Sequence, residues 1–171
     1  MGVFKISLIG EKGVGKSTFA NSYLTKTFDE DLRMTVGADW YAKDLEIDGK
    51  KVVIRFWVMS GVQRFKWLLP SFLGGSDAIF IMFDVSRLTS LNQIDSWIEA
   101  IKTKCYDIPI MLLGNKADLT EHFERIKVLA DSIVKKYRLM GYYEISALNS
   151  KNTDLILTTI TKTLLQKHGL I

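Results

Sequence analysis

The sequence contains a single cysteine, Cys105. One cysteine excludes an intramolecular disulfide, and it excludes a metal site built from several thiolates. Because structural disulfides belong to oxidising compartments, a lone thiol favours a reducing one. We therefore expect a cytoplasmic protein.

Long apolar runs are also missing. The longest uninterrupted ones, such as Ala78–Phe83, are far too short to cross a bilayer. Gly2 lacks the Ser or Thr that a myristoylation site carries four residues later, because the chain has Ile6 there. Residues 166–171 include no cysteine that could be prenylated. We expect no intrinsic membrane anchor in this chain.

No stretch gathers basic and aromatic residues, although the net charge is +4. Evenly spread lysines and arginines indicate a solvated surface, so we expect no nucleic-acid binding. An apolar fraction of 47% and a charged fraction of 25% are those of a soluble globular protein. The 171 residues suffice for one domain with a real core, so residues 1–171 are interpreted as a single domain and a monomer.

The most informative stretch is Gly10–Ser17, which reads G-x-x-x-x-G-K-S and is called the phosphate loop below. It follows the apolar run Val3–Ile9 and precedes a helical pattern, the context that this motif requires. Glycines allow backbone N–H groups to turn toward a phosphate chain, and a helix N-terminus adds positive potential. Lys16 would reach the β- and γ-phosphates, and the Ser17 hydroxyl would bind Mg²⁺. The residues of this loop expected to bind the nucleotide are Gly13, Val14, Gly15, Lys16, Ser17 and Thr18.

Strand and helix patterns alternate along the rest of the chain, which predicts an α/β fold. Asp48-Gly49 between two strand patterns predicts a tight hairpin, and hence one antiparallel edge strand in an otherwise parallel six-stranded sheet with helices on both faces. In such sheets, ligands bind beyond the carboxyl ends of the strands. The expected strands are 3–9, 38–47, 51–58, 78–85, 108–114 and 142–145, and the expected helices are 18–24, 90–104, 121–138 and 153–167.

Two segments at strand ends predict recognition of guanine. In Asn115-Lys116-Ala117-Asp118, the Asp118 carboxylate can accept hydrogen bonds from the ring N–H and the exocyclic amine of guanine, whereas adenine offers no such pair of donors. The stem of Lys116 would pack along the base, and the backbone N–H of Ala147 would donate to the guanine O6. The candidate base-binding residues are Asn115, Lys116, Asp118, Ser146, Ala147 and Leu148.

With these motifs the chain resembles the Ras superfamily of small GTPases, most closely the Rab branch. The resemblance implies a P-loop NTPase G domain that binds GTP or GDP with Mg²⁺, and partners that include effector, exchange-factor and activating proteins. It also implies roles for three further residues: Phe28 packs against the guanine, Thr35 binds Mg²⁺ together with Ser17, and Gly61 contacts the γ-phosphate. The positions that Rab proteins use as an aromatic effector-facing patch hold Trp40, Trp57 and Phe72, for which packing in the core is the alternative.

The segment around Gly61 departs from the family pattern. Val58 replaces the aspartate that holds Mg²⁺ through water, and Val62 replaces the glutamine that orients the attacking water. Lys12 adds bulk inside the phosphate loop. We therefore expect intact nucleotide binding, a weakened metal site and weak hydrolysis. The candidate catalytic residues are Lys16, Thr35, Gly61 and Gln63, with a shift of register allowing Gln63 to stand in for the missing glutamine.

Two functions remain open after this comparison. One is a slow GTPase that cycles between GTP and GDP states with the help of partner proteins. The other is a binding module that holds GTP or GDP without significant turnover and acts as a scaffold. An ATP-using P-loop enzyme conflicts with Asn115–Asp118.

Overall fold

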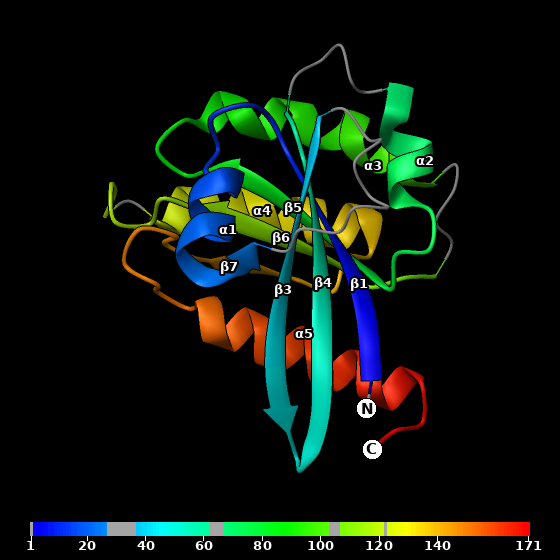
Figure 1. Cartoon of the computed structure of the whole chain (residues 1–171). Helices are drawn as coiled ribbons and strands as arrows, with labels where there is room; N and C mark the ends of the chain where they lie inside the picture. The colour runs from blue at the N-terminus through cyan, green and yellow to red at the C-terminus, as the bar shows by residue number, and fades with distance from the viewer. Residues whose placement is uncertain (1, 27–36, 62–66, 103–106, 122) are drawn as a thin grey trace.

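The structure is a computed structural model of the chain, and it describes residues 2–26, 37–61, 67–102, 107–121 and 123–171. Figure 1 shows a twisted sheet with helices on both sides. The strand order is β2-β3-β4-β1-β5-β6-β7, in which β3 is antiparallel to both β2 and β4 and the other neighbouring strands are parallel. The predicted α/β architecture is confirmed, and the predicted six strands are joined by the two-residue strand β2 at the sheet edge. The strands are β1 Gly2–Ile9, β2 Thr25–Lys26, β3 Ala38–Ile47, β4 Lys50–Met59, β5 Ala78–Asp84, β6 Ile110–Asn115 and β7 Gly141–Glu144.

The helices cover the two faces of the sheet separately. Helices α1 and α5 contribute to one apolar cluster, and α2, α3 and α4 contribute to the other. Strand β5 is buried along its whole length, and its side chains enter the two clusters alternately, as the two-residue period of a strand requires. The helices are α1 Lys16–Tyr23, α2 Leu69–Leu73, α3 Ile94–Lys102, α4 Phe123–Tyr137 and α5 Thr153–Lys167, with a 3₁₀ helix, η3, at Leu88–Gln93.

The hairpin between β3 and β4 has the predicted two-residue turn. Asp48 and Gly49 both have positive φ, at 49° and 73°, which is the conformation of the tight turn that suits twisted strands. The turn fixes the register of the ten residue pairs that follow it, ending with Asp39 opposite Val58 and Ala38 opposite Met59. The far end of the hairpin therefore lies beside the phosphate loop.

The start of the second predicted helix, expected at residues 90–104, differs from expectation. Residues Leu88–Gln93 form the 3₁₀ helix η3, and the α-helix begins only at Ile94. The Ser90 hydroxyl donates to the Arg87 carbonyl oxygen at 2.8 Å and accepts from the Asp84 backbone N–H at 2.9 Å. Such local side-chain bonds to the backbone compete with α-helical pairing, which explains the tighter turn. Within the described ranges, no helix is both long enough and apolar enough to span a bilayer.

Candidate nucleotide-binding site

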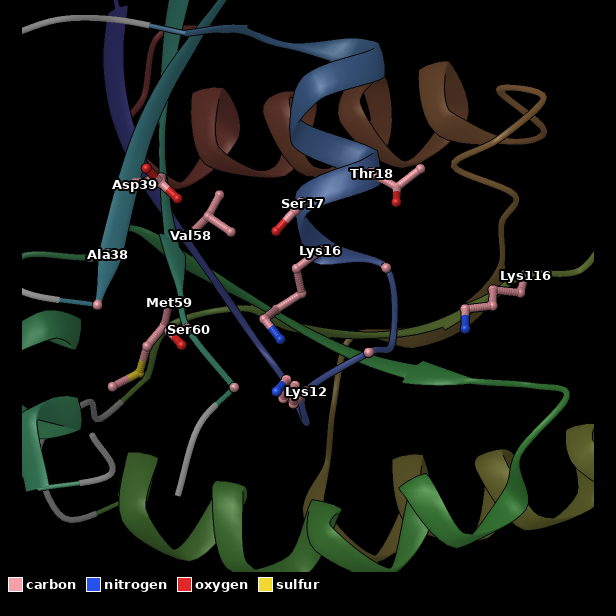
Figure 2. A pocket seen from close by; sticks show the side chains of 14 residues that line it. Lys12, Lys16, Ser17, Thr18, Ala38, Asp39, Val58, Met59, Ser60 and Lys116 are labelled. Atoms are coloured by element: carbon pink, nitrogen blue, oxygen red, sulfur yellow. The ribbon is translucent and has the colours of Figure 1, made fainter. Parts of the chain in front are cut away.

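A cavity of about 580 Å³ opens where β1 and β4 end and α1 begins. Figure 2 shows the labelled side chains around it, with Lys12 and Lys16 near the middle of the view and Lys116 at its right. The position agrees with the rule that ligands bind beyond the carboxyl ends of parallel strands. The lining residues are Lys12, Gly13, Gly15, Lys16, Ser17, Thr18, Gly37, Ala38, Asp39, Val58, Met59, Ser60, Gly61 and Lys116.

The phosphate loop has the backbone conformation that its glycines predict. Gly13 and Gly15 have φ of 82° and 101°, which side chains rarely adopt. A Cβ on Gly15 would lie 2.1 Å from Nδ2 of Asn115, so only glycine fits there. Helix α1 follows directly, and no side chain caps its first N–H groups. These donors and the helix dipole form a favourable site for an anion at the cavity wall.

Lys16 is held against the phosphate loop from inside. Its Nζ donates to the carbonyl oxygens of Gly10 and Glu11, each at 2.8 Å, and the residue is 6% exposed. Burial lowers the pKa of the Lys16 ammonium from 10.5 to about 8, although the Glu11 carboxylate partly opposes this change. An ammonium has three N–H donors, so two bonds to the loop still allow one toward a phosphate. Binding a phosphate there would compensate the charge that burial disfavours.

Asn115 joins three loops of the site. Its Nδ2 donates to the Val14 carbonyl oxygen at 2.9 Å, and its Oδ1 accepts from the Ala147 N–H at 2.9 Å. Asn115 is 1% exposed and follows β6, so these bonds are shielded from water. The residue acts as a positioning group that fixes the phosphate loop relative to residues 115–118 and 146–148. The Ala147 N–H donates to Asn115 here, and its expected hydrogen bond to the guanine O6 stays a prediction.

The two hydrogen bonds of Asn115, to Val14 and Ala147, are called the Asn115 clamp below. The remaining candidate base-binding residues lie around it. The Ser146 hydroxyl donates to the Asp118 carboxylate, which keeps that side chain beside the last loop. Leu148 follows and is 75% exposed. Lys116 has φ of 66° and extends along the cavity wall to Asp84, where Nζ lies 2.6 Å from the carboxylate. Burial alone would raise the pKa of Asp84, but hydrogen bonds from Lys116 and Ser86 outweigh it and lower the pKa.

Gly61 lies directly against the phosphate loop. A Cβ at this position would be 2.4 Å from the backbone nitrogen of Lys12 and 2.6 Å from the Gly10 carbonyl oxygen, so any side chain would force the two segments apart. The neighbouring Ser60 N–H donates to the Gly37 carbonyl oxygen at 2.6 Å, which ties the ends of β3 and β4 together. The position is consistent with the expected contact between Gly61 and a terminal phosphate.

The donor set fits a hydrated Mg²⁺ that also binds phosphate oxygens. Within the described ranges, no group of three or more His, Cys, Asp or Glu residues could hold a metal alone. Ser17 offers an exposed hydroxyl on the cavity wall. Val58 packs in the apolar cluster beneath α1, and its hydrocarbon side chain has no oxygen to offer a metal. Asp39 lines the same cavity and is the only carboxylate among its lining residues. Ser17 would therefore bind the ion together with phosphate oxygens and water.

The three residues of the expected effector patch form a chain of ring contacts, called the aromatic cluster below. Trp40 and Trp57 lie edge to face with centroids 5.8 Å apart, and Trp57 contacts Phe72 at the same distance. Both tryptophans are half-buried, whereas Phe72 is 2% exposed and belongs to the core. Nζ of Lys5 lies 3.6 Å from the Trp57 ring centroid and donates to the Phe72 carbonyl oxygen at 2.7 Å. The accessible aromatic surface is therefore that of the two tryptophans, and Phe72 follows the alternative of core packing.

Four residues of the prediction lie outside the described residues. They are Phe28, Thr35, Val62 and Gln63. Their expected contacts with base, metal and attacking water stay predictions.

Two residues that sequence reasoning missed also belong to the site. Arg87, in the loop after β5, donates from a guanidinium nitrogen to the Lys12 carbonyl oxygen at 3.1 Å and lies 3.3 Å from the Glu11 carboxylate. No local pattern marks it, because its partners are more than 70 residues away. Asp39 could have been found, because a two-residue turn at Asp48-Gly49 places it opposite Val58 by simple counting.

Comparison with known proteins agrees with this geometry. Residues 5–166 match the model of the Ras family. The chain is 34% identical over 169 residues to the Ras-related protein Rab-19 of Bos taurus, covering 98% of this chain and 78% of the relative. It is 32% identical over 172 residues to the GTP-binding protein yptV5 of Volvox carteri, covering 97% and 84%. It is 32% identical over 168 residues to the Ras-related protein Rab-18 of Lymnaea stagnalis, covering 97% and 82%.

The matched region contains the phosphate loop, the hairpin and both base-recognition segments. A family match over this length agrees with the parallel sheet, the cavity at its carboxyl edge and the residues that surround it. The chain belongs to the Ras family of small GTPases, in its Rab-like branch.

Proposed function

We propose that the protein is a guanine-nucleotide-binding switch whose intrinsic GTP hydrolysis is weak. The observation that carries this proposal is the Asn115 clamp, which holds the phosphate loop and the base-recognition segments in one rigid arrangement. A nucleotide that occupies the cavity would have its phosphates at the N-terminus of α1 and its base near Asp118. This arrangement supports binding of GDP and GTP over adenine nucleotides.

The residues of the cavity offer groups that would bind and orient the phosphates. Backbone N–H groups of the phosphate loop and the start of α1 would surround the phosphate chain, and Lys16 would add a positive charge from its position against the loop. Mg²⁺, when bound, would neutralise charge on the β- and γ-phosphate oxygens. Ser17 would hold it together with Thr35 of the family pattern. Gly61, which lies directly against the phosphate loop, would contact the terminal phosphate.

Hydrolysis requires an oriented water, and this part of the site is altered. Val62 can neither donate to water nor accept from it, and Val58 is an apolar, buried residue at the former aspartate position. We therefore propose an intrinsic rate below the order of 10⁻⁴ per second that Ras reaches. Gln63 and Lys12 are the two residues that could partly restore the function, Gln63 by orienting water and Lys12 by adding a cation near the γ-phosphate.

A second function is supported by the same substitutions. If hydrolysis is negligible, the protein would hold GTP or GDP as a scaffold that partners recognise by shape. Valine at position 58 favours this function, because its side chain lines the cavity but has no polar atom that could bind metal or water.

Partner binding is proposed to use the aromatic cluster. Trp40 and Trp57 keep part of their surface accessible and are held at a fixed angle by ring contacts and by Lys5. A rigid aromatic surface loses little conformational entropy on binding, which suits it as an anchor for an effector protein. Exchange factors and activating proteins would act on the adjoining segments that contact the nucleotide.

Single-turnover hydrolysis separates the two functions. Protein loaded with γ-labelled GTP is expected to release phosphate more slowly than an intact relative, and Val62→Gln is expected to raise the rate. Val62→Gln combined with Lys12→Gly is expected to raise it further, since both residues act on the same phosphate. A rate equal to that of an intact relative would contradict the proposal of weak hydrolysis. A rate that stays at the uncatalysed level even in the double variant would favour the scaffold.

A further inference from the structure

The cavity contains one carboxylate that no part of the family pattern assigns to the metal. Asp39 pairs directly with Val58 across the β3–β4 ladder, and both residues line the cavity together with Ser17. Figure 2 shows Asp39 and Val58 on the strands and Ser17 on the facing helix α1, with the Ser17 hydroxyl directed toward them. Val58 occupies the position where the family aspartate would stand. Position 58 thus carries no carboxylate, but Asp39 on the neighbouring strand does.

The register explains why Asp39 faces the cavity. Residues directly opposite each other in an antiparallel pair point to the same face of the sheet, and neighbouring residues point to opposite faces. Trp40 and Trp57 form one such pair and pack together on the face of α2. Asp39 and Val58 form the next pair and therefore point to the other face, where α1 carries Ser17.

The coordination chemistry of Mg²⁺ allows a carboxylate on the neighbouring strand to replace one at position 58. Cβ atoms of directly paired residues lie about 4.5–5.5 Å apart. The Asp39 side chain therefore starts that far from position 58, a separation that one water molecule between carboxylate and metal can bridge. Mg²⁺ keeps several of its waters in proteins, and the family aspartate itself acts through water. A carboxylate that accepts a hydrogen bond from a metal-bound water would orient the hydrated ion against Ser17 and the phosphates.

We propose that Asp39 takes over the metal-orienting role of the missing aspartate, so that Mg²⁺ binding survives the substitution at Val58. This inference rests on the proposed function, because the ion is bound together with a guanine nucleotide. Asp39 acts as a positioning residue through metal-bound water. The weakened metal site expected from Val58 alone is then largely compensated, and hydrolysis is limited by Val62 instead.

The test measures the Mg²⁺ affinity of the GDP-bound protein, without reference to turnover. Release of a fluorescent GDP analogue is followed while free Mg²⁺ is titrated, and Mn²⁺ binding to the same complex is measured by electron paramagnetic resonance. The unaltered protein is expected to release the analogue at least tenfold faster after chelation. Asp39→Asn is expected to lower the metal affinity by about 10–100-fold, the usual cost of losing such an outer partner.

Asp44→Asn is the matched control, because it removes the same charge from the same strand on the opposite face. It is expected to change the metal affinity less than twofold. Equal metal affinities for the unaltered protein and Asp39→Asn would overturn the inference while leaving nucleotide binding intact. If Asp39→Asn no longer binds GDP, the metal affinity of Asp39→Glu is measured instead. Mg²⁺-dependent GDP release in Asp39→Glu would support the proposed role of Asp39, and its loss would overturn that role. Absence of GDP binding in the unaltered protein would instead refute the proposed function.

Discussion

Replacing Asn115 by alanine tests whether the clamp holds the nucleotide site together. The substitution removes two hydrogen bonds of 2.9 Å and leaves the Val14 carbonyl and the Ala147 N–H without this partner in a region where Asn115 is 1% exposed. Leaving a buried backbone group unpaired costs about 1–3 kcal/mol, so the two groups together would cost about 2–6 kcal/mol. Because the clamp adjoins the open cavity, water can reach part of the space, and we expect a loss of about 2–3 kcal/mol.

Thermal unfolding of the nucleotide-free protein measures this loss. A loss of that size lowers the melting temperature of a domain this long by about 4–12 °C. Asn149→Ala serves as the control, because Asn149 is exposed and accepts only one long hydrogen bond, from the Lys151 N–H at 3.3 Å. Asn115→Asp separates the two bonds: it keeps the acceptor for Ala147 but places a carboxylate against the Val14 carbonyl oxygen.

Dissociation of GDP supplies the functional measurement. Since the clamp fixes the phosphate loop relative to the base-recognition segments, both variants of Asn115 are expected to release GDP at least tenfold faster than Asn149→Ala. A melting temperature within 1–2 °C of the control would refute the assignment of the two bonds as buried and structural. Faster release without any loss of stability would mean that Asn115 contacts the nucleotide directly and does not act by positioning.

Three further predictions follow from the site. Burial lowers the pKa of Lys16 to about 8, and a bound phosphate raises that pKa, so nucleotide binding takes up a proton above pH 8. GDP affinity should therefore fall as the pH rises from about 8 to about 9. Lys16→Arg should abolish this pH dependence. An affinity that rises over this range would contradict the assignment. Asp118→Asn should shift the preference toward xanthine nucleotides, whose extra carbonyl accepts from an amide, and competition by ATP equal to that by GTP would exclude guanine recognition. Fluorescence of Trp40 and Trp57 should differ between GDP and a non-hydrolysable GTP analogue, and identical spectra and hydrogen exchange would favour the static scaffold.

The parts of the fold that could be predicted from sequence are those governed by local rules. The glycines of the phosphate loop, the Asp48-Gly49 turn and the helix Thr153–Lys167 were all expected, and the structure has them. Each follows from contacts between residues near in sequence: positive φ, turn geometry and helical periodicity. The 3₁₀ helix at Leu88–Gln93 was missed, because a single Ser90 hydroxyl bonded to two backbone groups decided it.

The parts of the site that could not be predicted depend on contacts over long distances in sequence. The bonds of Asn115 to Val14 and Ala147 bring together residues up to 101 positions apart, and a four-residue motif does not reveal them. Arg87 belongs to the same class, since only the folded sheet places it beside Lys12. Asp39 differs, because the hairpin register contained its position although the family pattern directed attention to Val58.

The identity of the nucleotide that remains bound after purification tests the central claim most directly. Protein purified in the presence of Mg²⁺ is denatured, and the released nucleotide is identified and quantified by chromatography. A guanine nucleotide close to one per chain is the predicted result, with a substantial share of GTP if hydrolysis is as weak as Val62 implies. An adenine nucleotide, or a protein that is free of nucleotide and takes up none on incubation with GDP and Mg²⁺, would contradict the account.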